Sequence, residues 1–319
     1  MTTVLNNPLL SNPLRPALLA AARSPRLEAT IGKMRITRQL VDRFVAGESE
    51  PDAVEAVTSL LASGRFVSVD YLGEDTTDAA QAAVTVDAYL SLLQAYSTLA
   101  SGPRALEVSV KLSALGLGID TSLALANARA ICDAAQKAGV WVTIDAEDHT
   151  TTDSALAIVR TLRQDFPDLG TVLQAYLKRT EGDCREFSGP RSRIRLCKGA
   201  YNEPQSVAFQ KPADVSDSYV RCLRVLMDGQ GYPMVASHDP EMIDAADRFA
   251  LAAGRGVDTY EYQMLYGIRD AEQQRLVGDG RHVRVYVPYG DQWYGYFMRR
   301  LAERPANLMF FVRSLVSRS

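Results

Sequence analysis

Arg299 and Arg300 are adjacent in the segment YGDQWYGYFMRRLAERPAN, which runs from Tyr289 to Asn307. Two neighbouring guanidinium groups can hold a small carboxylate through paired, charge-assisted hydrogen bonds. At about 100° per residue, one arc of about 100° on a helix would carry four polar side chains, namely Tyr296, Arg299, Arg300 and Glu303. Two interpretations are open: a solvated helix face with an Arg299–Glu303 ion pair, or a carboxylate clamp in which Glu303 restrains one arginine.

Polar and ionisable side chains also stand at the ends of short apolar runs elsewhere in the chain. They are Lys111, Asp145, Glu147, Asp148, Gln174, Arg195, Lys198, Ser237, His238, Glu261, Gln263 and Tyr286. Each has an ordinary structural interpretation, such as a salt bridge for Lys111 or a cap of the following turn for His238. Burying so many polar groups without partners is unfavourable, so their repeated placement at run ends indicates a shared site.

The runs themselves are short and rich in β-branched residues, and amphipathic stretches of helical length separate most of them. The eight runs cover residues 65–73, 105–115, 140–148, 170–177, 192–201, 232–239, 258–267 and 281–290. Strand and helix alternating eight times is typical of an α/β protein with a closed (β/α)8 barrel of the TIM type, whose functional residues lie at the C-terminal ends of the strands. No GxGxxG or GxxxxGK[ST] motif follows any run, which argues against a Rossmann site and a P-loop.

The sequence predicts two parts. Residues 1–64 form an N-terminal helical segment packed on the barrel, and residues 65–319 form the barrel with a C-terminal helical tail. The segment that carries Arg299 would be the last barrel helix, and ANLMFFVRSLVS would be an extra C-terminal helix. Because the Arg299 helix begins about one residue after the eighth strand, it lies near the mouth toward which Lys111 and Tyr286 point. This position favours the carboxylate clamp.

Composition excludes several classes of function. The formal net charge of −3 argues against nucleic acid as the main partner. Four cysteines without CxxC spacing and only three histidines favour reduced thiols and no metal centre. No apolar stretch reaches the roughly 18 residues that a membrane-spanning helix needs. Residues 1–27 carry arginines and no acid, as in a mitochondrial presequence, but Pro8, Pro13 and Pro16 interrupt any amphipathic helix there, so we expect an untargeted, cytoplasmic protein of bacterial type.

A series of short segments occurs in a characteristic order: KLSALG, DAED, QAYLKR, RLCKGAY, SHD, EYQMLYG, YVPYG and YGYFMRRLAERPAN. In residues 66–307 the chain therefore resembles proline dehydrogenase, the FAD-dependent barrel enzyme of proline catabolism. The chain is too short for the fused aldehyde-dehydrogenase half of bifunctional relatives, so the resemblance is to the monofunctional bacterial form. It implies that FAD oxidises L-proline to 1-pyrroline-5-carboxylate and that a quinone accepts the electrons, which would require a peripheral encounter with the inner membrane.

The resemblance also implies roles for individual residues. It implies substrate contacts for Lys111, Tyr296, Arg299, Arg300 and Glu303, and a place in the catalytic centre for Asp145, Arg195 and Tyr286. Flavin contacts are implied for Ala146, Gln174, Arg195, Lys198, Gly199, Ala200, Ser237 and His238. Three positions depart from the usual pattern of the family without removing a functional group: Cys197, Asn202 and Ser237.

The implied mechanism is hydride transfer from the ring carbon beside the proline nitrogen to the flavin, while the cationic side chains fix the substrate carboxylate. We expect Asp145 to hold Lys111 or an arginine in place rather than to act as a base. Two alternatives stay open: an aldolase that forms a Schiff base through Lys111 or Lys198, and a catalytically inactive barrel that only binds a ligand. Oligomeric state and the preference between proline and hydroxyproline are also open.

Overall fold

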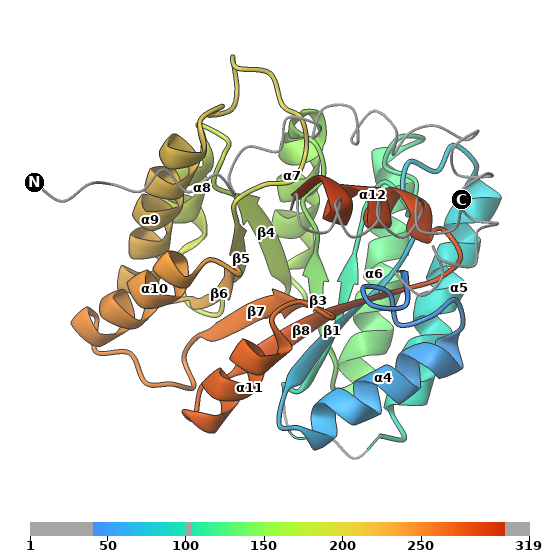
Figure 1. Cartoon of the computed structure of the whole chain (residues 1–319). Helices are drawn as coiled ribbons and strands as arrows, with labels where there is room; N and C mark the ends of the chain where they lie inside the picture. The colour runs from blue at the N-terminus through green and yellow to red at the C-terminus, as the bar shows by residue number, and fades with distance from the viewer. Residues whose placement is uncertain (1–40, 100–101, 103, 304–319) are drawn as a thin grey trace, which may run out of the picture.

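The computed structural model describes residues 41–99, 102 and 104–303, which form a closed barrel of parallel strands that follow one another in chain order (Figure 1). The strands are β1 (Phe66–Tyr71), β2 (Leu106–Val110), β3 (Trp141–Ile144), β4 (Gly170–Gln174), β5 (Arg193–Cys197), β6 (Tyr232–Ala236), β7 (Glu261–Leu265) and β8 (Val283–Tyr289). Strand β1 also pairs with β8, which closes the barrel. The predicted TIM-type barrel is confirmed, and each strand lies within the run that predicts it.

Helices follow the first seven strands and cover the outside of the barrel. They are α5 (Ala79–Tyr96), α6 (Thr121–Ala138), α7 (Thr152–Leu162, after the short 3-10 helix η2, His149–Thr151), α8 (Thr180–Phe187), α9 (Pro212–Asp228), α10 (Pro240–Ala252) and α11 (Asp270–Gly278). Asp120 and Asp239 cap α6 and α10 by accepting the backbone N–H two residues later. Within the described ranges, no helix is both long and apolar enough to cross a bilayer.

Two helices depart from the simple alternation of strand and helix. Helix α4 (Glu50–Ala62), which belongs to the predicted N-terminal segment, packs against β1, β8 and α5 on the outer wall. Helix α12 (Trp293–Glu303) follows β8. In the view of Figure 1 it lies above the strands, whereas α4 lies low beside them. The apolar side chains of α12 pack with Val41, Phe44 and Val45 and with Leu72, just after β1.

The predicted helix after the eighth strand is present, and it lies near the mouth, as the sequence predicts. Three residues, 290–292, separate β8 from α12, and the apolar partners of α12 lie at the strand ends rather than on the wall. Residues 1–40 and the predicted tail helix after residue 303 lie outside the described residues, so their packing stays a prediction.

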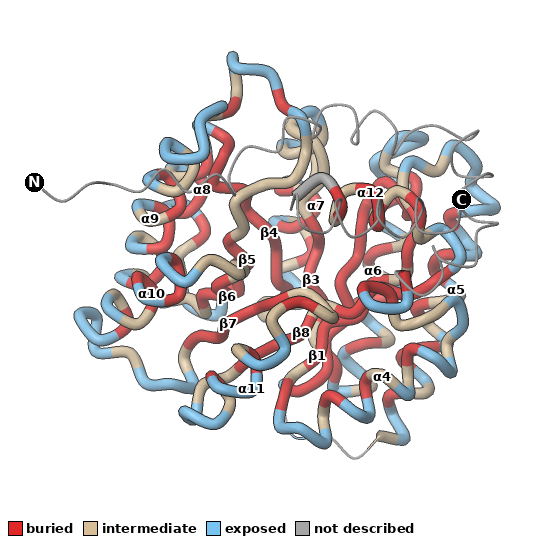
Figure 2. Tube along the Cα trace, in the orientation of Figure 1, coloured by how far each residue is buried: buried red, intermediate tan, exposed pale blue. Residues whose placement is uncertain are grey.

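The strands divide their side chains between two environments. Apolar residues such as Val67, Val69, Val108, Ile144, Leu196, Val235 and Val285 belong to the core shared with the helices. The residues that alternate with them are largely polar, although they are buried: Ser68, Asp70, Glu107, Ser109, Thr143, Gln174, Arg193, Arg195, Glu261, Gln263 and Arg284. Figure 2 shows the strands as the most buried part of the chain. Branched apolar residues usually fill the interior of such barrels, so a polar interior indicates a site that extends into the barrel.

Candidate active site

Lys111 directly follows β2 and is buried at the C-terminal end of the barrel. Its Nζ donates to Oδ2 of the fully buried Asp70 at 2.5 Å. Burial disfavours the charged ammonium, but the carboxylates of Asp70, Glu74 and Asp145 outweigh this effect and raise the pKa of Lys111. Lys111 is therefore a fixed positive charge at the mouth of the barrel.

Arg299 on α12 is a second cation at this mouth. Its guanidinium donates to both carboxylate oxygens of Glu74, with Nη1 2.9 Å from Oε2. Only 13% of the Arg299 side chain is exposed, and its guanidinium carbon lies 5.9 Å from the centroid of the Tyr201 ring. Burial disfavours the charge, but Glu74 and Tyr201 outweigh it and raise the pKa of Arg299. The Glu74 charge also helps to raise the pKa of Lys111, so this carboxylate stabilises the positive charge of both side chains.

Arg300 lies beside Arg299, and its guanidinium carbon is 5.0 Å from the centroid of the Tyr296 ring. Tyr296 is buried in the same apolar cluster as Phe297, and both arginines are half-buried. The structure therefore does not support the solvated helix face. Glu303 ends α12, but its side chain lies outside the described part of the structure, so its predicted pairing with an arginine stays a prediction.

Asp145, which follows β3, connects the mouth to the barrel interior. Its Oδ1 accepts hydrogen bonds from Arg195 Nη1 at 2.6 Å and Ser109 Oγ at 2.7 Å, and its Oδ2 accepts one from the Tyr286 hydroxyl at 2.8 Å. Burial, the largest influence, raises the pKa of Tyr286 well above its usual value, so the hydroxyl remains a donor. Asp145 thus holds an arginine, as the sequence predicts, whereas Lys111 is held by Asp70.

Two predicted cofactor ligands lie on neighbouring strands at this mouth. Gln174 ends β4, and its Nε2 donates to the Glu147 carbonyl at 2.8 Å. Lys198 follows β5, and its Nζ donates to Asp239 Oδ2 at 2.7 Å and to Ser216 Oγ at 3.0 Å. Together with Arg195, these side chains bring an amide, an ammonium and a guanidinium to one arc of the barrel. Such donors can hold a cofactor that carries anionic and hydrogen-bonding groups.

Ser237 and His238 follow β6 on the same side of the barrel. Ser237 Oγ accepts the Asp239 N–H at 3.1 Å, and His238 Nε2 accepts the N–H of Leu265 at 2.9 Å. An imidazole nitrogen that accepts a hydrogen bond carries no proton, so this contact selects the Nδ1–H tautomer of neutral His238. The interpretation of His238 as a turn cap is wrong, because Asp239 caps α10.

The remaining predicted cofactor residues are small. Gly199 has φ of 112°, and a Cβ there would lie 2.4 Å from a carbon of the Tyr176 ring, so only glycine fits this position. Ala146 and Ala200 are half-buried just after β3 and β5.

The predicted site residues omit Asp70 and Glu74, the carboxylates that bind Lys111 and Arg299. Asp70 interrupts the apolar pattern of FVSVDYL near a strand end, and this interruption could identify it as a site residue from the sequence alone. The sequence places Glu147 at a strand end but assigns it no role in the site. Glu147 accepts hydrogen bonds from the backbone N–H and hydroxyl of Ser113. Burial raises the pKa of Glu147 to about 7, although these hydrogen bonds and Lys111 oppose the shift.

The raised pKa of Glu147 predicts a pH dependence of stability. Between its ordinary value and about 7, Glu147 is ionised in the unfolded chain but protonated in the folded protein. The folded state binds more protons in this window, so the free energy of unfolding should fall as pH rises from about 5 to about 8. Urea unfolding at several pH values should show this component in wild type and not in Glu147→Gln. Parallel pH profiles for the two proteins would contradict the assignment.

Comparison with known proteins gives consistent matches along the chain. The family model described as proline dehydrogenase matches residues 53–313. Proline dehydrogenase of Deinococcus radiodurans is 41% identical over 311 residues, which cover 95% of this chain and 97% of that protein. Proline dehydrogenase 2 of Bacillus subtilis (strain 168) is 37% identical over 282 residues, covering 88% of this chain and 92% of that protein.

A solved structure of proline utilization A (PutA) from Bdellovibrio bacteriovorus, inactivated by N-propargylglycine, shares the barrel fold, with a TM-score of 0.76 and 23% identity. The alignment covers 83% of this chain but only 32% of that protein, so the chain spans about a third of its length. The fold is thus shared with a larger protein, and the sequence matches cover nearly the whole of shorter ones. From these matches, the chain belongs to the proline dehydrogenase family.

Proposed function

We propose that the protein oxidises L-proline to 1-pyrroline-5-carboxylate, with FAD as its cofactor and a quinone as the electron acceptor, in the first step of proline catabolism. The observation that carries this proposal is the placement of two largely buried cations at the mouth beside the Asp145–Tyr286 pair: Lys111, bound to Asp70, and Arg299, bound to Glu74. Two cations at one mouth can bind the carboxylate of a small amino acid. Membership of the family indicates that this amino acid is proline.

The substrate carboxylate would bind between Lys111 and the two arginines of α12. Lys111 and Arg299 already interact with protein carboxylates, Asp70 and Glu74, so their charges are stabilised before substrate arrives. Holding the carboxylate fixes the orientation of the small ring and lowers the entropic barrier to reaction. The nearby positive charges also favour the neutral form of the substrate nitrogen, which must lose its proton before oxidation.

The donor set at the mouth fits FAD. Lys198, beside Ser216 and Asp239, provides a cation suited to the phosphates, while Gln174 would provide an N–H group for the ring system. When bound, FAD supplies the acceptor for two electrons. Arg195 supplies positive charge on that side of the mouth, and the Tyr286 ring, held by its hydroxyl on Asp145, would cover the substrate.

The Schiff-base alternative fits the two lysines poorly. A nucleophilic lysine needs a neutral amine, which usually requires a lowered pKa. Asp70, Glu74 and Asp145 together overcome burial and raise the pKa of Lys111, and Lys198 is paired with Asp239 at 2.7 Å. Lys111 is therefore stabilised as an ammonium group and Lys198 is held in an ion pair, which favours binding roles over covalent catalysis.

An absorbance spectrum distinguishes the two reactions. We expect the purified protein to be yellow, and L-proline added without oxygen to bleach the flavin absorbance. A soluble quinone should then restore the colour faster than air does. A colourless protein that borohydride traps covalently with a carbonyl substrate would overturn the proposal in favour of the aldolase.

A membrane-bound quinone would place a cytoplasmic enzyme at the membrane surface during turnover.

A further inference from the structure

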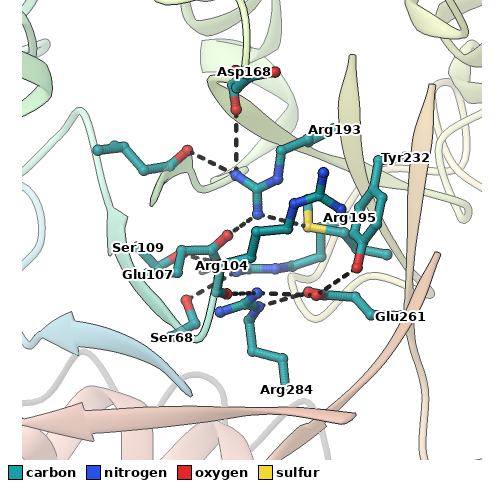
Figure 3. Close-up of polar contacts among 12 residues, drawn as sticks. Ser68, Arg104, Glu107, Ser109, Asp168, Arg193, Arg195, Tyr232, Glu261 and Arg284 are labelled. Carbon is teal, nitrogen blue, oxygen red and sulfur yellow. Dashed lines mark hydrogen bonds and ion pairs between the residues drawn. The ribbon is translucent and has the colours of Figure 1, made fainter. Parts of the chain in front are cut away.

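Below the candidate site, charged side chains fill the centre of the barrel (Figure 3). Glu107, the second residue of β2, is fully buried there. Its Oε1 accepts a hydrogen bond from Arg195 Nη2 at 2.6 Å, and its Oε2 accepts one from Arg193 Nη2. A single carboxylate therefore joins two arginines that lie two residues apart on β5.

Glu107 is the principal interior counter-charge of these arginines. Burial alone would raise the pKa of Glu107, but the guanidinium groups of Arg193, Arg284 and Arg195 outweigh burial and hold the pKa well below its usual range. Arg284 itself pairs with another carboxylate, that of Glu261, with Nε–Oε1 and Nη2–Oε2 distances of 2.7 and 3.0 Å. Glu107 is therefore ionised and compensates the β5 arginines from inside the barrel.

Arg195 is held rigidly by the groups around it. A guanidinium has five N–H donors, and contacts from all three Arg195 nitrogens occupy them. The acceptors are Gln263 Oε1 (2.5 Å), Ser109 Oγ (2.7 Å), Asp145 Oδ1 (2.6 Å), Ser68 Oγ (3.1 Å) and Glu107 Oε1 (2.6 Å). Two of these acceptors are carboxylates: Asp145 follows β3 at the mouth, whereas Glu107 lies near the start of β2. Arg195 is thus held between a carboxylate at the mouth and one deeper in the barrel.

We propose that Glu107 is a positioning residue for the oxidation: it holds the Arg195 guanidinium at the floor of the mouth and offsets part of its positive charge. This inference rests on the proposed function, in which Arg195 faces the flavin. A carboxylate in the barrel interior acts through a medium that screens charge poorly. Glu107 therefore limits how strongly the barrel stabilises the additional negative charge of reduced flavin.

The test compares Glu107→Gln with Glu261→Gln. Both substitutions remove one charge from a fully buried glutamate inside the barrel. Glu107 contacts Arg195 directly, whereas the carboxylate of Glu261 pairs with Arg284. The flavin midpoint potential of each protein is measured by anaerobic dithionite titration with an indicator dye, a reading that needs no turnover. Urea unfolding of the flavin-free proteins measures stability separately.

We expect both variants to lose stability, because each leaves buried arginines without a counter-charge. Only Glu107→Gln should shift the midpoint potential to a clearly more positive value, equivalent to an increase on the order of tenfold in the equilibrium constant for reduction. An unchanged potential, or an equal shift in Glu261→Gln, overturns the inference. A wild-type protein that binds no flavin or is not bleached by proline refutes the proposed function instead.

A double variant keeps the test decisive if Glu107→Gln does not fold. Glu107→Gln with Arg193→Met removes one negative and one positive charge, so the net charge of the barrel interior returns to that of the wild type. Arg195 still lacks the carboxylate of Glu107. We expect the double variant to recover stability and to retain part of the positive shift of potential, because Arg193 starts β5 and lies farther from the mouth than Arg195. A wild-type potential in a folded double variant would overturn the inference.

Discussion

Replacing Arg299 by methionine should raise the Michaelis constant (KM) for proline by about 10- to 100-fold, while the protein keeps its bound FAD. A charge-assisted hydrogen bond contributes roughly 1.5–3 kcal/mol, and a bidentate guanidinium supplies two of them in one geometry. Arg299 binds Glu74, whereas Gln174 and Lys198 have other partners, so flavin retention should not depend on Arg299. Steady-state kinetics and the flavin absorbance of the purified variant measure both effects.

Arg275→Met is the matched control for this substitution. Arg275 also forms salt bridges, to Glu272 and Asp279, but it is exposed on α11 and lies outside the site. Its replacement should leave proline kinetics unchanged. Arg299→Lys, which keeps the charge but not the paired donors, should give an intermediate KM. An unchanged KM in Arg299→Met would refute the carboxylate clamp.

Replacing Lys111 by methionine should weaken both proline binding and folding. Asp70 is fully buried, and removing its ammonium partner leaves a buried charge uncompensated, which typically costs about 3–5 kcal/mol. Burial already raises the pKa of Asp70 above its ordinary value in the wild type, and the Lys111 charge opposes that shift, so the loss of Lys111 should raise the pKa further. Stability of the variant should therefore fall, relative to wild type, as pH rises from the acid range toward neutrality. Urea unfolding at pH 5 and pH 8 measures this difference.

The double variant Lys111→Met with Asp70→Leu separates the two consequences. It removes the buried charge together with its partner, so folding stability should recover and its additional pH dependence should disappear. Proline binding should stay weak, because the cation that faces the substrate is still missing. Recovery of a wild-type KM in the double variant would show that Lys111 is only structural.

The barrel could be predicted because its signal is local and repeated. Runs such as VWVTIDAED combine β-branched residues with a polar end, and turn residues and amphipathic stretches separate them. The place of α12 near the mouth could be predicted from its short connection to the eighth strand. Its packing partners could not, because they are distant in the sequence, such as Val41 and Phe44.

The same distinction applies to the site. Lys111, Asp145 and Arg195 could be selected because each places a charge at or near a strand end, where a TIM-type barrel has its functional residues. The pairing of these charges could not be predicted, since Asp70 and Glu74 reach the cations only after the barrel closes. Glu107 lies near the start of its strand, outside the positions to which strand-end reasoning applies.

Comparing L-proline with pyrrolidine tests the central claim most directly, because the two compounds share the ring and its nitrogen but only proline has a carboxylate. In an anaerobic titration of the wild-type protein followed by flavin absorbance, we predict that proline bleaches the flavin at concentrations at which pyrrolidine has no effect. Equal bleaching by the two compounds would contradict the claim that Lys111, Arg299 and Arg300 select the substrate through its carboxylate.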